Sequence, residues 1–321
     1  MLLVGSAPGR ARNLAIALRS VKLGNGYRLR GLLLLPTSGA RRAWRLAGLA
    51  LLLAGSRGVP APALEPSIEV RPASARPGDV LLVIVRGGPS LPTGTAGEHP
   101  LRFYPAADHH EALVALPLEL EPGHLEISVD VDGSRLSTAM EIEPGHFPQR
   151  ELTVEQKFIA PPPEVKRWIA ADQRAFTRAY RTKFGPRAFE SGFTRPRDAE
   201  VTAHFGDQRT LNGKKKSVHY GLDLDGQVGD PVAAANDGTV VLVRSCYTSG
   251  NTVLISHGGG VITGYFHLSA FAVKQGARVK RGEVIGRVGK TGRVTGPHLH
   301  FLARVGNLYA NPESLLALPF P

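Results

Sequence analysis

The chain is short of cysteine, and its N-terminal segment has no acidic residues; each shortage excludes a class of function. Cys246 is the only cysteine among 321 residues, so an internal disulfide and a zinc site built from cysteines are excluded. Residues 1–64 contain ten Arg or Lys and no Asp or Glu, whereas the rest of the chain carries 29 basic and 27 acidic residues. Most of the formal charge of +12 therefore lies in the first segment, and overall charge gives no reason to expect a nucleic-acid partner.

The first segment also lacks an apolar run long enough to span a bilayer comfortably, but it has the layout of a signal peptide. Three arginines within residues 41–45 precede the short apolar stretch 46–55, and Ala61-Pro62-Ala63 fits a small-x-small cleavage site. We therefore expect residues 1–63 to be an export segment, and the mature protein to be periplasmic or secreted, without stable membrane insertion. An uncleaved membrane anchor is the alternative, and the paired arginines leave twin-arginine export open.

The part after the export segment is predicted to be mostly β. Short apolar runs such as Val80–Val85 and Leu113–Leu118 are separated by Pro-Gly pairs, and residues 125–131 alternate between apolar and polar side chains. These patterns favour an Ig-like β-sandwich over residues 64–158. A linker over residues 159–195 follows, in which Glu164–Lys183 has the apolar stripe of a helix that bridges two domains.

Residues 196–321 are rich in glycine and show no alternation of strands with helices. Apolar runs indicate antiparallel strands, which predicts a compact barrel-like sandwich of paired hairpins. The runs are Gly238–Arg244, Asn251–Ser256, Val261–His267 and Val284–Val288. Cys246 lies between such a run and a turn, which favours a packed thiol over a nucleophile.

Four residues in this second domain carry the candidate chemistry: His219, Asp223, His298 and His300. In an extended strand, residues two or four apart point to one face, so His219 faces the same way as Asp223, and His298 the same way as His300. Gly221 lies between the first pair and leaves room for a metal and a substrate backbone. Three of the four can make a zinc site with one open position, which is typical of a hydrolase.

The second domain has more histidines than such a site needs. His267 follows another strand, so two imidazoles could bind the metal while two others act as acids or bases. Asp225 shares the face of Asp223 and could compete with it as a ligand. The His109-His110-Glu111 turn of the first domain is expected to be solvated, and the other histidines are given no role.

At these residues the second domain resembles the LytM/lysostaphin-type zinc endopeptidases that hydrolyse peptidoglycan. The resemblance runs from about Val201 to Pro312 and rests on motifs in a fixed order: 205–209, 212–213, 219–223, 229–232, 265–269, 289–292 and 296–301. It implies one Zn²⁺ held by His219, Asp223 and His300, catalytic roles for His267 and His298, and peptidoglycan as the partner. It also implies a LytM-like catalytic domain and an N-terminal module of the kind found in many Gram-negative members.

One position departs from the family pattern, and two other functions stay open. Family members often carry an acidic residue after the His-x-His-Phe motif, where this chain has Leu302. The first alternative is a non-catalytic LytM-like regulator that activates other cell-wall hydrolases. Some relatives of this kind have lost metal ligands, whereas this chain has all of them. The second is a lipoyl- or biotinyl-type carrier domain, which would leave the histidines without a function. A cell-wall regulatory protein is a further expected partner.

Overall fold

The structure is a computed structural model that describes residues 20–22, 28–30 and 65–321. The chain divides into two units, Met1–Val59 and Pro60–Pro321. In the first unit, strands β1 (Ser20–Lys22) and β2 (Arg28–Arg30) pair in antiparallel fashion, and the rest of the expected export segment lies outside the described residues.

The N-terminal part of this unit is built from two β-sheets that enclose one apolar core. Alternate residues of strand β10 (Gly123–Val131) face that core, as the sequence pattern predicts: Leu125, Ile127, Val129 and Val131 are buried. One sheet has the order β3 (Ser67–Arg71), β5 (Val80–Arg86), β9 (His109–Ala115) and β8 (Tyr104–Pro105). The other has the order β4 (Ser74–Ala75), β11 (Ser134–Ile142), β10 (Gly123–Val131), β6 (Thr93–Ala96) and β7 (His99–Pro100).

Strand β5 is buried on both faces, which explains its unbroken apolar sequence. Leu81, Val83 and Val85 point into the core between the two sheets. Val80, Leu82 and Ile84 point the other way, into the core of the C-terminal part. The N-terminal sheets and the C-terminal part therefore share buried apolar surface.

The expectation that the His109-His110-Glu111 turn is solvated is wrong. His109 begins strand β9, which pairs with β5 and β8, and its Nε2 lies 2.8 Å from a carboxylate oxygen of the fully buried Glu111. The Arg187 guanidinium lies 3.3 Å from the other oxygen of Glu111. A buried carboxylate needs such partners, and the sequence alone did not reveal that Arg187 would provide one.

Three short elements lead from the N-terminal sheets to a long helix. Strand β12 (Gln149–Leu152) falls within the range expected for the first domain, but it pairs in parallel with β14 (Gln208–Leu211) of the C-terminal part, and β14 pairs with β15 (Lys215–Val218). Helix α1 (Gln156–Ile159) and a 3₁₀ turn, η1 (Pro163–Val165), follow.

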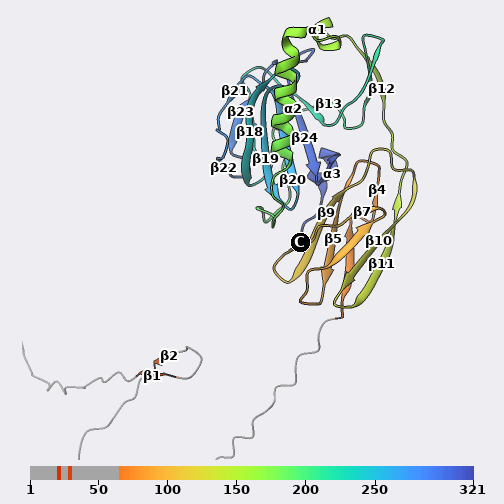
Figure 1. Ribbon diagram of the computed structural model, residues 1–321, viewed down its shortest axis with the longest axis vertical. Helices are drawn as coiled ribbons and strands as arrows, with labels where there is room; N and C mark the ends of the chain where they lie inside the picture. Colours follow the sequence, from red (N-terminus) through yellow and green to blue (C-terminus); the bar gives the residue numbers. More distant parts are fainter. Residues whose placement is uncertain (1–19, 23–27, 31–64) are drawn as a thin grey trace, which may run out of the picture. The chain divides into compact units, whose positions relative to one another are not determined.

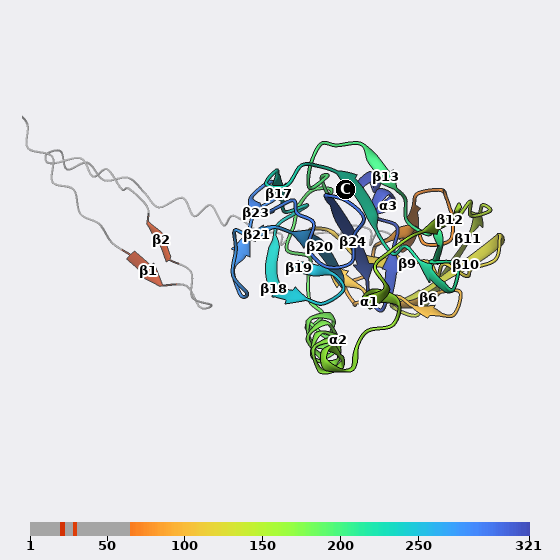
Figure 2. The ribbon, with the colours of Figure 1, turned by 90° about the horizontal axis from the view of Figure 1, so that it is seen from above.

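Helix α2 (Lys166–Tyr180) falls within the segment that the sequence predicted to be helical. It lies against the strands of the C-terminal sheet, as Figures 1 and 2 show. Phe176 and Tyr180 join a small apolar cluster with Phe266 and Leu302 of the sheet. Leu302, the departure from the family pattern, is thus a buried apolar contact in the layer that α2 covers. Among the described residues, no helix has the length and apolarity needed to cross a membrane.

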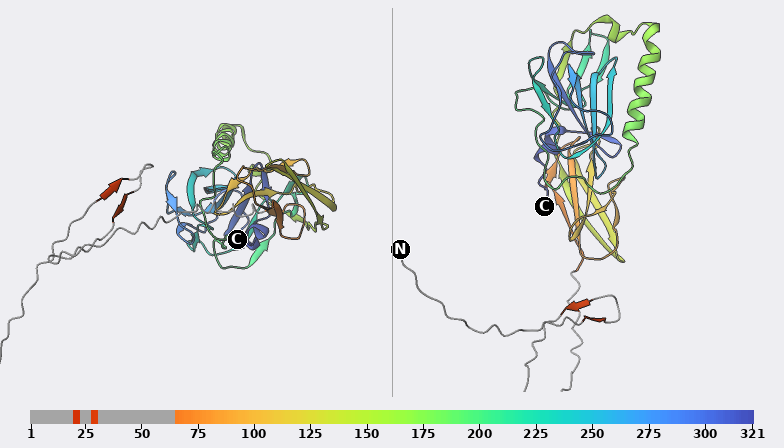
Figure 3. Two further views of the ribbon diagram at one scale, coloured as in Figure 1. Left: turned by 90° about the horizontal axis from the view of Figure 1, so that it is seen from below. Right: turned by 90° about the vertical axis from the view of Figure 1, so that its left-hand side faces the viewer.

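The C-terminal part consists mainly of one antiparallel sheet, seen from two further sides in Figure 3. Its order is β13 (Val201–Ala203), β16 (Leu222–Asp225), β24 (His298–Val305), β20 (Val261–Leu268), β19 (Gly250–Gly258), β18 (Gly238–Cys246) and β22 (Arg278–Val279), with β25 (Leu308–Ala310) beside β24. A small sheet contains β17 (Pro231–Ala233), β23 (Val284–Arg287) and β21 (Ala270–Phe271), and helix α3 (Pro312–Ala317) follows β25. The fold is mostly β with antiparallel sheets, as the sequence predicts.

Candidate functional site

The order of three strands brings the candidate residues together. Strand β24 lies between β16 and β20, with His300 opposite Asp223 on one side and opposite Phe266 on the other. His298 lies two residues before His300 on the same face, and His267 follows Phe266. Residues that are about 80 positions apart in the sequence therefore meet because antiparallel pairing sets their register.

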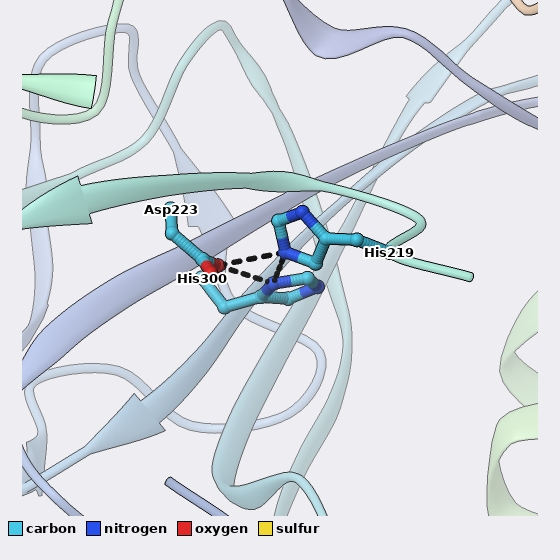
Figure 4. Close-up of side chains that lie close together, drawn as sticks. All are labelled: His219, Asp223 and His300. Carbon is cyan, nitrogen blue, oxygen red and sulfur yellow. Dashed lines mark hydrogen bonds and ion pairs between the residues drawn. The ribbon is translucent and has the colours of Figure 1, made fainter. Parts of the chain in front are cut away.

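His219, Asp223 and His300 form a compact cluster, which we call the ligand cluster (Figure 4). Nε2 of His219 lies 2.9 Å from Oδ1 of Asp223 and 2.9 Å from Nδ1 of His300. Nδ1 of His300 lies 2.7 Å from the same oxygen. Three potential ligand atoms thus converge on one point from different elements.

The chemistry of this cluster fits a bound cation. Nδ1 of His219 lies 2.7 Å from the backbone oxygen of His204, which can only accept a hydrogen bond. In the neutral ring, the proton therefore sits on Nδ1, and Nε2 presents a lone pair to the carboxylate oxygen of Asp223. The lone pairs of Nε2 and of the carboxylate oxygen repel each other at hydrogen-bond distance unless a positive charge lies between them. Two imidazoles with one carboxylate are a donor set that zinc prefers.

The Asp223 carboxylate is held in its ionised form. Burial opposes ionisation, but the hydrogen bonds that His219 and His300 form when their facing nitrogens carry a proton outweigh it and keep the pKa of Asp223 well below its usual value. The second carboxylate oxygen, Oδ2, accepts a hydrogen bond of 3.1 Å from the Arg209 guanidinium. Because Arg209 occupies Oδ2, Oδ1 is the oxygen left for a metal.

Two further imidazoles flank the ligand cluster. Nδ1 of His267 donates to the backbone oxygen of Thr291 at 2.8 Å, and Nδ1 of His298 donates to the backbone oxygen of Gly296 at 3.0 Å. In the neutral tautomer that each bond selects, the proton is on Nδ1 and Nε2 has the lone pair, and Nε2 of His298 lies 3.8 Å from Oδ1 of Asp223. The ring centroids of His267 and His298 are 5.1 Å apart, so both nitrogens belong to one site.

His267 has an unusual backbone and an altered acidity. Its φ of 63° is in the left-handed region, which residues other than glycine seldom adopt and which often marks functional sites. Burial, with smaller contributions from His300 and His298, lowers the pKa of His267 to about 3. The ring is therefore neutral at pH 7, which is the form that can accept a proton.

The site lies in a groove of about 1050 Å³ between the sheet and helix α2. Strand β12, several side chains of α2 and the loop 293–297 line it, together with all five candidate residues. Asp225, the possible competing ligand, lines the groove but is exposed and is not part of the ligand cluster. Cys246 is a buried free thiol whose pKa is raised by burial, as expected for a packed residue.

Gly221 provides room, but for a different group than the sequence suggested. Strand β16 begins at Leu222, so His219 and Gly221 lie in the turn before it rather than in the strand. A Cβ on Gly221 would lie 2.4 Å from Cε1 of His300 and 2.8 Å from the backbone oxygen of Phe301. The space next to Gly221 is therefore filled by the His300 ring.

Gly221→Ala is expected to displace the His300 ring and to lower the free energy of unfolding by about 1–3 kcal/mol, as overpacking of a closed site does. Thermal unfolding and uptake of a divalent metal ion would both be measured. Gly185→Ala is the matched control, because a Cβ there meets no atom within 4 Å. An unchanged melting temperature and unchanged metal uptake for Gly221→Ala would contradict the conclusion that the His300 ring fills the space beside Gly221.

Sequence reasoning missed two residues that organise the site. Arg209 fixes the second oxygen of Asp223, and the Thr291 carbonyl fixes the tautomer of His267. Both residues belong to motifs that carry the family resemblance, and this was the available sign that they lie near the site. Their contacts depend on how separate loops meet, and residue spacing does not encode that.

Comparison with known proteins finds one family model that matches the segment carrying the site. Residues 217–312 match the family model of Peptidase family M23. The DD-carboxypeptidase/endopeptidase Mpg of Neisseria meningitidis serogroup B is 49% identical over 104 residues, which are 32% of this chain and 24% of that protein. The peptidoglycan DD-endopeptidase ShyC of Vibrio cholerae is 42% identical over 135 residues, which are 40% of this chain and 30% of that protein.

The likeness to a solved structure extends further along the chain. A crystal structure described as an M23 peptidase of Pseudomonas aeruginosa is 28% identical, with a TM-score of 0.58, and the match covers 75% of this chain and 94% of that one. The chain spans less than a third of the length of the two curated relatives above.

Proposed function

We propose that this chain, whose residues 217–312 form a peptidase M23 domain, is an exported zinc metalloendopeptidase that cleaves peptide bonds in the stem peptides or cross-links of peptidoglycan. The convergence of His219, Asp223 and His300 beside two further histidines in one groove carries the proposal. The names of the relatives, a DD-carboxypeptidase/endopeptidase and a peptidoglycan DD-endopeptidase, support the choice of substrate.

The ligand cluster would hold a single Zn²⁺ per chain. Nε2 of His219, Oδ1 of Asp223 and Nδ1 of His300 are the three ligand atoms in this proposal, which leaves a position open. Zinc bound there would polarise the scissile carbonyl and lower the pKa of a bound water towards about 7. Arg209 orients the carboxylate, and the His204 carbonyl orients the His219 ring.

His267 and His298 are the groups that would move protons. In its neutral form, each ring has its Nδ1–H held by a backbone carbonyl, so each would accept a proton at Nε2 and return it to the leaving amine. An imidazolium at either position can also stabilise negative charge on the attacked carbonyl oxygen. The neutral state of His267 at pH 7 suits the accepting role.

The N-terminal sheets and the export segment complete the proposal. We further propose that residues 64–158 form an Ig-like module, and the observation behind this proposal is that two β-sheets enclose one apolar core there. We further propose that an enzyme with a wall substrate works in the periplasm or outside the cell, with a regulatory protein of the cell wall as a further partner.

Digestion of purified sacculi tests this function. The mature protein is expected to release peptides whose masses correspond to hydrolysis of an amide bond, as identified by mass spectrometry of muropeptides. A chelator should abolish the release, and added Zn²⁺ should restore it. If the zinc-loaded protein left sacculi intact but stimulated another wall hydrolase, the regulator would be the better description; the complete set of ligand residues favours the enzyme.

A further inference from the structure

Four arginines line the groove, and three of them have evident partners in the protein. Arg150 pairs with the buried Asp207 at 2.8 Å, and Arg209 pairs with Asp223 at 3.1 Å. The Arg304 guanidinium lies 4.4 Å from the centre of the Tyr180 ring. These three side chains therefore have structural roles that account for their positions.

Arg293 differs from the other three. Within the described part of the chain, its guanidinium makes no ion pair, no side-chain hydrogen bond and no stacking contact with an aromatic ring. The side chain is half-buried, and burial together with the nearby charge of Arg209 lowers the pKa of Arg293. Placing a half-buried cation next to another cation costs free energy unless an anion binds beside it. An arginine that is fully solvated at the surface needs no such anion.

The loop that carries Arg293 is fixed at the site. The Arg293 backbone N–H donates to the backbone oxygen of Thr248 at 2.7 Å, and Thr291, two residues earlier, holds the His267 ring. Gly296, three residues later, holds the His298 ring. Arg293 thus lies between the anchors of the two proposed proton-transfer histidines, and its guanidinium needs no large loop movement to face a bound peptide.

We propose that Arg293 is a specificity-determining residue that binds a free carboxylate on the substrate, on the carbon that bears the scissile amide nitrogen. The inference rests on the proposed function and names its substrate class. A cross-link or a chain end in which a D-amino acid supplies the amine has such a carboxylate, whereas an internal bond of a linear peptide, such as one between two glycines, has none. An arginine guanidinium binds a carboxylate with two parallel hydrogen bonds. A charge-assisted hydrogen bond of this type raises the affinity about 10- to 100-fold.

Two synthetic peptides would test the inference. One is a D-alanyl amide of a D-configured diamino acid with its neighbouring carboxylate free, and the other is the same peptide with that group as the carboxamide. The zinc-loaded wild-type protein is expected to cleave the acid with a kcat/KM about 10- to 100-fold higher, mainly through KM. Arg293→Met should remove this preference, so that the ratio of kcat/KM for the acid to that for the amide falls to about 1, and Arg293→Lys should retain part of it.

Lys290→Met is the matched control, because Lys290 is an exposed cation on the same loop that does not line the groove. It should keep the full preference for the acid. Equal cleavage of the two peptides by the wild-type protein would overturn the inference and leave the proposed function intact, even if Arg293→Met did not fold. Cleavage of neither peptide nor sacculi would instead count against the proposed function.

Discussion

His300→Ala is expected to give a folded protein that retains no zinc and leaves peptidoglycan uncut. Nδ1 of His300, on strand β24, contacts both other members of the ligand cluster. Without it, two protein ligands remain, and these hold zinc poorly. Burial lowers the pKa of His300 to about 4, so at pH 7 the wild-type ring is neutral and available to a metal. Metal analysis of the purified protein measures the loss.

The control for this experiment is a histidine outside the groove. His124 is exposed on β10, and His124→Ala should keep the zinc content of the wild-type protein. Stoichiometric zinc in the His300→Ala protein would refute the ligand assignment. A melting temperature measured in the presence of a chelator would separate loss of the metal from loss of the fold, because both proteins are then compared without zinc.

His267→Ala is expected to keep zinc and to lose most activity. General acid–base catalysis typically raises the rate about 10²–10⁴-fold, which corresponds to lowering the activation barrier by roughly 3–5 kcal/mol. His267 is outside the ligand cluster, so the metal should stay. Its φ of 63° disfavours alanine, and His267→Asn is therefore the cleaner variant, because asparagine tolerates the left-handed region. Turnover on a peptide substrate, zinc content and melting temperature would be measured for both variants.

The alternative for His267 is a packing role beside the site. A catalytic role gives normal zinc, a near-normal melting temperature for His267→Asn and a collapsed turnover rate. A packing role gives a lowered melting temperature with turnover per folded molecule intact. The second pattern would remove His267 from the mechanism and leave His298 as the imidazole available for proton transfer.

The sequence alone determined the features that depend on local periodicity and on spacing along a strand. Alternation over residues 125–131 and the apolar stripe of Glu164–Lys183 predicted a strand and a helix, because each period fixes which side chains share a face. The His-x-His pair on β24 follows the same rule. The short motifs around His219, His267 and His298 were sufficient to indicate the family of the second domain.

Only the tertiary structure decided what depends on the meeting of distant segments. It determined that β5 is buried on both faces, that β12 joins the C-terminal sheet, and that the His300 ring fills the space beside Gly221. It also identified the Arg209 contact with Asp223 and the carbonyls that fix the imidazole tautomers. Strand register and loop packing set these contacts, and both arise from the burial of apolar surface over the whole chain, which no local pattern specifies.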